Sequence, residues 1–117
     1  MRRRILTTPE REAWRDTQNR CWLCGKRCEI QVHEITSGPH RQKALSEPCT
    51  WIATCLWCHD TFQYMPLPAQ LAYKLLNDPA NYDRQRVNAV RRRAPDAIDA
   101  SEVESELKRI LSERAER

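Results

Sequence analysis

The sequence predicts a small α+β fold, in which a zinc ion staples a β-hairpin to a helix, with one helix before this unit and a helical extension after it. Two Cys-x-x-Cys pairs, CWLC at 21–24 and CLWC at 55–58, bracket two short stretches rich in β-branched residues. Helical patterns follow residue 65. At 117 residues the chain can bury one small core, which a cross-link would reinforce. We therefore expect a zinc-bound ββα domain at 1–64 and a helical extension at 65–117, packed on it or following it.

Composition is that of an ordinary folded protein. Hydrophobic residues make up 40% of the chain and charged residues 31%. No apolar run approaches the length of about 18 residues that a membrane span needs. The basic start, MRRRILTTPE, lacks the apolar segment of a secretory signal. The predicted location is therefore the cytoplasm.

The segment TTPEREAWRDTQNR, at 7–20, is predicted to be a helix. Thr8 is placed to cap its start and Pro9 to occupy its first position, with two glutamates in the first turn. Asn19 is placed to close it, and the first cysteine pair follows at once.

Six cysteines in a chain without a secretory signal favour metal binding over three disulfides, because reducing compartments keep thiols reduced. Two residues between cysteines let one tight turn aim both thiolates at one ion, and two such turns complete a tetrahedral zinc site. Gly25 permits the positive φ that often ends such a turn. The predicted zinc ligands are Cys21, Cys24, Cys55 and Cys58. The remaining Cys28 and Cys49 are expected to be small buried residues, although Cys28 could replace one ligand.

Between the cysteine pairs, the segments CEIQVHEI at 28–35 and CTWIAT at 49–54 are predicted to be the two strands of a hairpin. The loop that joins them holds at most one helical turn, at 41–46. A helix is expected to begin at His59 and to stop before Pro66, because proline cannot sit inside a helix. The tryptophans around the cysteine pairs are expected in the core. They are Trp22, Trp51 and Trp57.

Three further helices are predicted after the prolines. PAQLAYKLLND at 68–78 places its leucines on one face, and DRQRVNAVRRR at 83–93 is strongly basic. SEVESELKRILSERAER at 101–117 opens with the Ser-x-x-Glu pattern of a capping box at Ser101.

The net charge of +4 is unevenly distributed. Residues 1–20 hold six arginines against three acids, and residues 84–93 hold five arginines and no acid, whereas residues 99–117 are acidic overall. Two basic patches indicate a polyanionic partner on one side of the protein. The alternative is that each patch is simply a solvated helix face.

His33 and Glu34 stand side by side in the first predicted strand, and His59 directly follows the second cysteine pair. With both cysteine pairs on one zinc ion, the hairpin carries His33 towards His59. Two imidazoles near a carboxylate can bind a hydrated divalent ion, which stabilises the charge that develops when a phosphodiester is cut. A neighbouring base activates the water.

These pieces resemble the HNH endonuclease family, which has a ββα-metal fold with paired zinc knuckles. The resemblance covers roughly residues 10–64 and rests on REAWRDTQNRCWLCG, VHEI and CLWCHD; the pairing of C-x-x-C with C-x-x-C-H is its specific part. The segment HEITSGPHRQKA is similar to a His-Glu-Ile, Gly, Arg pattern of phage-encoded HNH-like proteins. The resemblance implies a nuclease that acts on DNA with Mg²⁺, Mn²⁺ or Ni²⁺, in the host cytoplasm if the protein is phage-encoded.

By register, the resemblance places His33 at the metal-ligand position and Glu34 at the position of the general base. Alternatively, His33 is itself the base and Glu34 helps to hold the metal. His59 matches the pattern directly. The family's middle Asn falls at Thr50 and its last ligand at Gln63, and both are departures.

The basic residues expected to contact DNA phosphates lie in the loop and in the basic helix, besides the N-terminal arginines. They are Arg41, Arg84, Arg91 and Arg92. A second hypothesis is a zinc-ribbon nucleic-acid-binding module with weak or no cleavage. A third is a zinc-stapled protein-interaction module that docks through its C-terminal helix.

Overall fold

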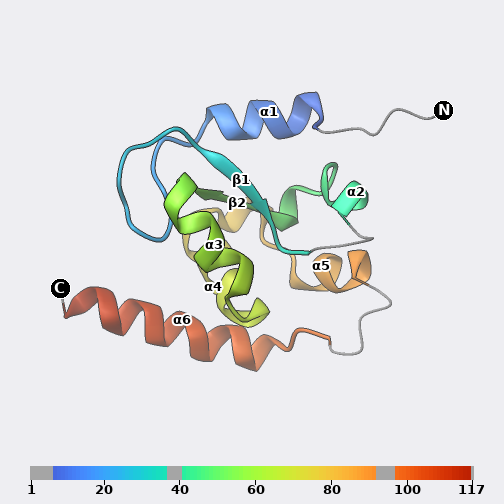
Figure 1. Cartoon of the computed structure of the whole chain (residues 1–117). Helices are drawn as coiled ribbons and strands as arrows, with labels where there is room; N and C mark the ends of the chain where they lie inside the picture. Colours follow the sequence, from blue (N-terminus) through green and yellow to red (C-terminus); the bar gives the residue numbers. More distant parts are fainter. Residues whose placement is uncertain (1–6, 37–40, 92–96, 117) are drawn as a thin grey trace.

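The computed structural model describes residues 7–36, 41–91 and 97–116 (Figure 1). The helices are α1 (Pro9–Asp16), α2 (Arg41–Ala44), α3 (Leu56–Tyr64), α4 (Leu67–Asn77), α5 (Arg84–Val90) and α6 (Ala100–Ala115), and the strands are β1 (Gln31–Glu34) and β2 (Trp51–Thr54). Two 3-10 turns are η2 (Pro48–Thr50) and η3 (Pro79–Asn81). The fold is a small α+β arrangement around one hairpin, as the sequence predicts. None of the described helices has the length and apolar character of a membrane span.

The two strands pair in antiparallel fashion, with Gln31 opposite Thr54 and Glu34 opposite Trp51. Both strands are shorter than expected. Residues 28–30 precede the ladder, and residues 48–50 form η2 instead of the start of a strand. Pro48 favours this turn, because it lacks the N–H that a ladder needs. The hydroxyl of Thr50 completes the turn by donating to the Glu47 carbonyl at 2.8 Å.

The first helix begins as predicted. The Thr8 hydroxyl caps α1 by accepting the Arg11 N–H at 3.1 Å. The helix ends at Asp16, earlier than the expected Asn19, because the Thr17 hydroxyl donates to a carbonyl of the last turn at 2.6 Å. The chain is then free to turn into the first cysteine pair.

The helix expected to begin at His59 starts three residues earlier, at Leu56. The cause is a cysteine cap: the Cys58 N–H donates to the Cys55 Sγ at 3.4 Å. The second cysteine pair therefore belongs to the first turn of α3, and His59 lies inside the helix.

The predicted capping box of the last helix is wrong. Asp99, and not Ser101, is the N-cap of α6, because its carboxylate accepts the Ser101 N–H at 3.4 Å. The predicted basic helix ends at Val90, and residues 92 and 93 of that prediction lie outside the described residues.

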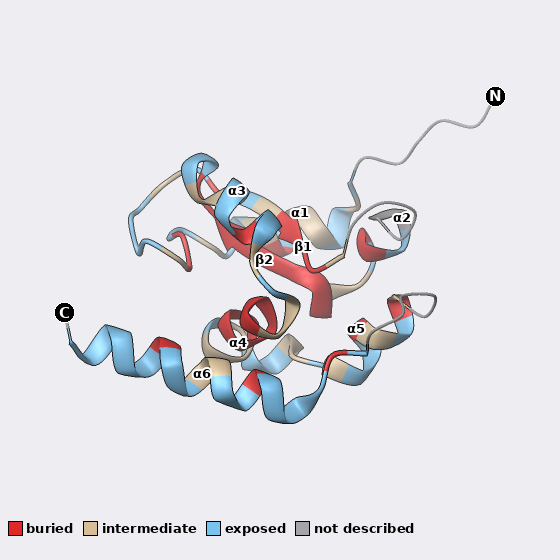
Figure 2. Cartoon of the chain, turned by 60° about the horizontal axis from the view of Figure 1, so that its bottom comes forward, coloured by how far each residue is buried: buried red, intermediate tan, exposed pale blue. Residues whose placement is uncertain are grey.

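The core lies between the hairpin and the helices that follow it. α4 packs against β2 on one side and against α6 on the other, and in Figure 2 it is the most buried helix, whereas α6 is buried only along one edge. One cluster joins Trp51 of β2, Leu71 of α4 and Ile110 of α6. The helical extension therefore shares a core with the hairpin.

A buried lysine fixes this packing. Lys74 of α4 is fully buried, and its ammonium donates to the Trp51 carbonyl at 2.7 Å and to the Asp78 carboxylate at 2.8 Å. It also lies 4.9 Å from the ring centroid of Trp14, in cation–π geometry. Burial lowers the pKa of Lys74, and the bond to Asp78 opposes this effect. Since a buried charge without a partner is costly, this network ties α4 to β2.

Candidate functional site

Four cysteines converge where the first cysteine turn meets the start of α3. The Sγ atoms of Cys21, Cys24, Cys55 and Cys58 all lie within 4.8 Å of one another. This confirms that the two Cys-x-x-Cys pairs form one cluster. Four thiolates at such distances can hold a metal ion, and the set suits a structural ion such as zinc.

Local geometry explains why both turns point their sulfurs inward. Gly25 adopts a φ of +76° and donates its N–H to the Cys21 carbonyl at 2.9 Å, which closes the first turn. The second turn is the Cys55 cap of α3. The hydrogen bond that closes each turn spans no more than five residues of chain.

The electrostatics of the cluster favour a bound cation. Burial raises the pKa of the Cys21 thiol, but hydrogen bonds from backbone groups and from Thr54 outweigh it and lower that pKa to about 6. Burial and the neighbouring cysteines raise the pKa of Cys58. Cys21 therefore loses its proton readily, whereas the neighbouring cysteines disfavour a second thiolate at Cys58. A bound divalent cation would stabilise both thiolates.

The other two cysteines lie outside this cluster. Cys49 is buried, and burial raises the pKa of its thiol to about 11. Cys28 is half-buried and packs against the core. Neither belongs to a ligand group within the described residues.

His33 and His59 are brought together as predicted from the hairpin. Their ring centroids are 5.4 Å apart in an edge-to-face arrangement. His33 is buried and stacks on Phe62 at 6.0 Å, whereas His59 is half-buried. β1 and α3 therefore bring two imidazoles together, with the His33 ring buried and the His59 ring half-buried.

Gln70 of α4 fixes the His33 ring. The Gln70 amide nitrogen donates to the Met65 carbonyl at 2.8 Å, so its oxygen faces the His33 Nε2 at 2.8 Å. Because an amide oxygen only accepts, Nε2 carries a proton and Nδ1 keeps a lone pair when the ring is neutral. Burial lowers the pKa of His33, with a partial offset from the Gln70 bond, which favours the neutral ring.

Glu34 lies on the other face of β1. Its Oε1 accepts a hydrogen bond from Arg11 Nη2 of α1 at 2.8 Å, and both side chains are largely buried. The same Nη2 also approaches the Val32 carbonyl at 3.3 Å. Since strand neighbours point to opposite faces, the structure separates Glu34 from His33 instead of uniting them.

The two positions that depart from the HNH pattern do not extend the histidine pair. The Thr50 hydroxyl is used inside η2, where it also lies 3.2 Å from the Ala44 carbonyl. Gln63 is exposed on α3.

The arginines predicted to bind DNA have varied surroundings. Arg84 donates to the Ile98 carbonyl at 2.8 Å, and Arg91 is half-buried just after α5. The described residues leave out Arg92, the first three arginines of the chain (residues 2–4) and the side chain of Arg41.

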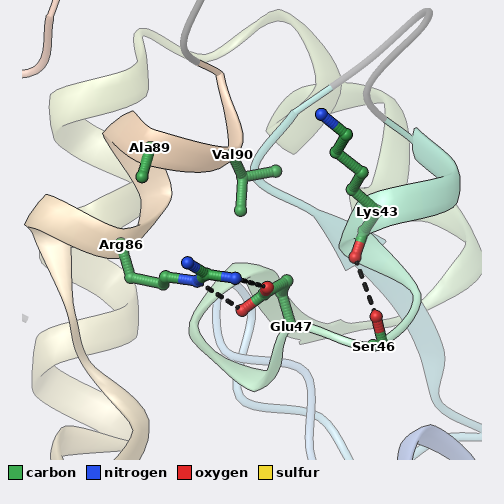
Figure 3. Close-up of a pocket in the computed structure, with 6 residues that line it drawn as sticks. All are labelled: Lys43, Ser46, Glu47, Arg86, Ala89 and Val90. Atoms are coloured by element: carbon green, nitrogen blue, oxygen red, sulfur yellow. Dashed lines mark hydrogen bonds and ion pairs between the residues drawn. The ribbon is translucent and has the colours of Figure 1, made fainter.

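A shallow pocket of about 270 Å³ lies beside α5 (Figure 3). Arg86 forms an ion pair with Glu47 on its wall, and Lys43 extends away from that pair. Part of the basic charge of α5 is therefore already compensated within the protein.

Two contact residues escaped the sequence-based prediction, Gln70 and Arg11, and the prediction for Trp57 is wrong. Gln70 lies 37 residues from His33 and Arg11 lies 23 residues from Glu34, so no local pattern joins these pairs. A usable signal existed for Gln70, since it is a polar residue three positions from both Leu67 and Tyr73, on an apolar side of its helix. Trp57 was expected in the core and is 87% exposed, because α3 starts early and turns it outward.

No protein-family model matches this chain, and neither does any curated protein or solved structure. The functional assignment therefore depends on the geometry of the chain's own residues. That geometry offers a cluster of four cysteines and a pair of imidazoles, in which His59 directly follows the last cysteine and His33 comes from β1 with an acceptor nitrogen.

Proposed function

We propose that the protein is a metal-dependent endonuclease of the HNH type that hydrolyses phosphodiester bonds of DNA. The observation that carries the proposal is the 5.4 Å approach of the His33 and His59 rings. One ring comes from a hairpin strand and the other from the helix directly after the second strand. In this proposal zinc holds the four cysteines and so fixes the strand and the helix at that approach.

In the proposed mechanism, His33 is the general base. Its neutral ring takes the proton of the attacking water at Nδ1. The Nε2–H group meanwhile keeps its hydrogen bond to the Gln70 oxygen. Gln70 thereby selects the tautomer and holds the ring in place, as a positioning residue. Arg11 occupies the side chain of Glu34, so in this proposal Glu34 supports the strand and does not take the proton.

His59 has a different role, since its half-buried ring stands at the surface edge of the pair. It would hold a divalent cation such as Mg²⁺, Mn²⁺ or Ni²⁺ against the phosphate. A cation bound there stabilises the negative charge of the transition state. His59 also places the phosphate within reach of His33.

A second candidate is a zinc-ribbon module that binds nucleic acid without cutting it. The observation in its favour is that Glu34 is engaged by Arg11 and that neither Thr50 nor Gln63 adds a ligand to the histidine pair. Such a module would retain DNA binding under conditions in which no cation restores cleavage.

The test is a nicking assay on supercoiled plasmid with Mg²⁺, Mn²⁺ or Ni²⁺. We expect the zinc-loaded wild type to nick and His33→Ala to be slower by about 100-fold or more. The control is Lys108→Ala, because Lys108 is exposed on α6 and the change should leave the rate unchanged. Zinc content and circular dichroism must be equal in all variants. No cleavage by folded wild type with any cation, or full cleavage by His33→Ala, would contradict the proposal.

A further inference from the structure

One face of α3 exposes large side chains that contribute nothing to the core. Leu56, Trp57 and Tyr64 are 69%, 87% and 83% exposed. Trp57 and Tyr64 are seven residues apart, so they lie on the same side of the helix, about two turns from each other. A nearly fully exposed tryptophan at a rigid position indicates a contact surface.

Trp57 is held rigidly because it lies inside the second cysteine turn. It directly precedes Cys58, whose Sγ belongs to the four-cysteine cluster. The first cysteine turn meets the same cluster, with Cys24 Sγ only 3.9 Å from Cys55 Sγ. The exposed residues that flank the first cysteine pair therefore lie around the same four-cysteine cluster as Trp57.

These neighbours are basic. Arg20, Lys26 and Arg27 are exposed on the first turn, where Arg20 and Arg27 are bridge partners. Arg114 of α6 reaches the same turn by donating to the Trp22 carbonyl at 3.1 Å. A hollow of about 250 Å³ lies between Arg20, Arg114 and the loop after Cys24.

The charge of these four residues is not compensated by carboxylates. Arg20 donates to the Gly25 carbonyl at 3.1 Å, and Arg114 also bonds a carbonyl. Within the described parts of the chain, the ion pairs involve other cations. A divalent ion with four thiolates has a formal charge of about −2, so the four cations exceed the charge of the cluster itself.

We propose that this surface, formed by Trp57, Arg20, Lys26, Arg27 and Arg114 and called here the knuckle surface, binds an unpaired strand of nucleic acid. An aromatic ring at a rigid position stacks on a base, and cations around it hold the phosphates. Bases inside a duplex have both faces covered, so Trp57 selects a single strand, a frayed end or a branch. This inference rests on the proposed function in that it names the substrate of the same protein.

The test is fluorescence anisotropy with a labelled 12-nucleotide DNA, offered as a single strand and as a blunt duplex, without added divalent cation. We expect Trp57→Ala to weaken binding of the single strand by about tenfold or more, since one stacked base contributes about 1–3 kcal/mol. Duplex binding should change by less than about twofold, and Trp57→Phe should retain an intermediate affinity for the single strand. Because Trp57 is outside the core, zinc content should stay unchanged.

The cations are tested by the salt dependence of the same binding. Arg27→Ala should lower the slope of log Kd against log salt by about 0.7 for the single strand, as expected when one phosphate contact is lost. Lys108→Ala removes the same charge from the exposed side of α6 and is the matched control, with no change expected.

The inference is overturned if Trp57→Ala binds the single strand as wild type does. It is also overturned if neither oligonucleotide binds, in which case the exposed aromatic face is left for a protein partner. These outcomes are independent of nicking. If the wild type nicks plasmid and Trp57→Ala binds the single strand normally, the endonuclease proposal stands and the knuckle-surface proposal fails. If Trp57 is needed for single-strand binding but no cleavage is seen, the knuckle-surface proposal stands and the endonuclease proposal fails.

Discussion

The four-cysteine cluster and the His33–His59 pair are adjacent in the fold, yet different contacts hold them. Each cysteine turn closes on itself, through the Gly25 N–H in one case and the Cys55 cap in the other. The His33 ring is held instead by Gln70 from α4 and by stacking on Phe62. The two cysteine turns therefore close through local chain geometry, whereas the orientation of the histidine depends on the packing of a distant helix.

Glu34 deepens this contrast. It is the sequence neighbour of His33, but its partner Arg11 comes from α1 on the other face of the strand. Adjacency in sequence places two groups in one site within a tight turn and separates them within a strand. Residues close in sequence therefore share a site in the cysteine turns but face opposite sides in β1.

The largest expected effect comes from breaking the cluster. Cys21→Ser should lose the metal ion and unfold the hairpin, because a structural zinc site contributes about 10–16 kcal/mol to the folded state. The measurements are metal content, with about one ion expected per wild-type chain, and circular dichroism. Cys28→Ser is the matched control and should keep the ion. If Cys21→Ser remains folded without metal, the four-cysteine cluster is not what stabilises the fold.

The next effect separates the roles of His33 and Glu34. Glu34→Gln should destabilise the protein by about 2 kcal/mol, because the Arg11 guanidinium loses its buried counter-charge. Its nicking rate should stay within about threefold of wild type. Chemical denaturation and the plasmid assay provide the two readouts. A loss of about 100-fold in rate at unchanged stability would instead make Glu34 the base.

Gln70 tests whether a distant helix orients the histidine. Gln70→Leu removes a hydrogen bond that raises the pKa of His33, so that pKa should fall further, whereas Gln70→Glu should raise it. We expect Gln70→Leu to nick about tenfold more slowly. The His33 ring proton followed by NMR through a pH titration gives the pKa directly. Unchanged titration in both variants would mean that the bond does not control the ring.

The smallest effect is on stability as a function of pH. Burial lowers the pKa of His33 in the folded protein below its ordinary value of 6.5. The unfolded chain therefore takes up this proton first as the pH falls. The stability due to His33 is full above about pH 6.5 and is lost as the pH drops towards the folded pKa.

This pH dependence is measured as a difference between wild type and His33→Gln, because metal ligands also take up protons in acid. The slope of unfolding free energy between pH 7 and pH 5.5 should be shallower in the variant. Equal slopes in the two proteins would contradict the prediction, because they would mean that folding does not lower the pKa of His33.

Much of the scaffold could be predicted from the sequence. The Thr8 cap, the Pro66 stop and the two cysteine turns are made by residues within a few positions of each other, and short-range geometry decides them. The boundaries that failed were decided by side chains competing for the same backbone groups, as when Asp99 displaces Ser101 as the cap of α6.

The sequence by itself determined the elements and the convergence of Cys21, Cys24, Cys55 and Cys58, because two-residue spacing leaves a thiolate pair few directions to point. The tertiary structure alone decided which side of β1 each reactive group faces, what holds it, and that Trp57 points to solvent. Gln70, Arg11 and Lys74 act across 23 to 37 residues of chain, and only the packing of α1 and α4 on the hairpin brings them into contact. Those contacts leave His33 neutral and oriented while Glu34 is tied to an arginine.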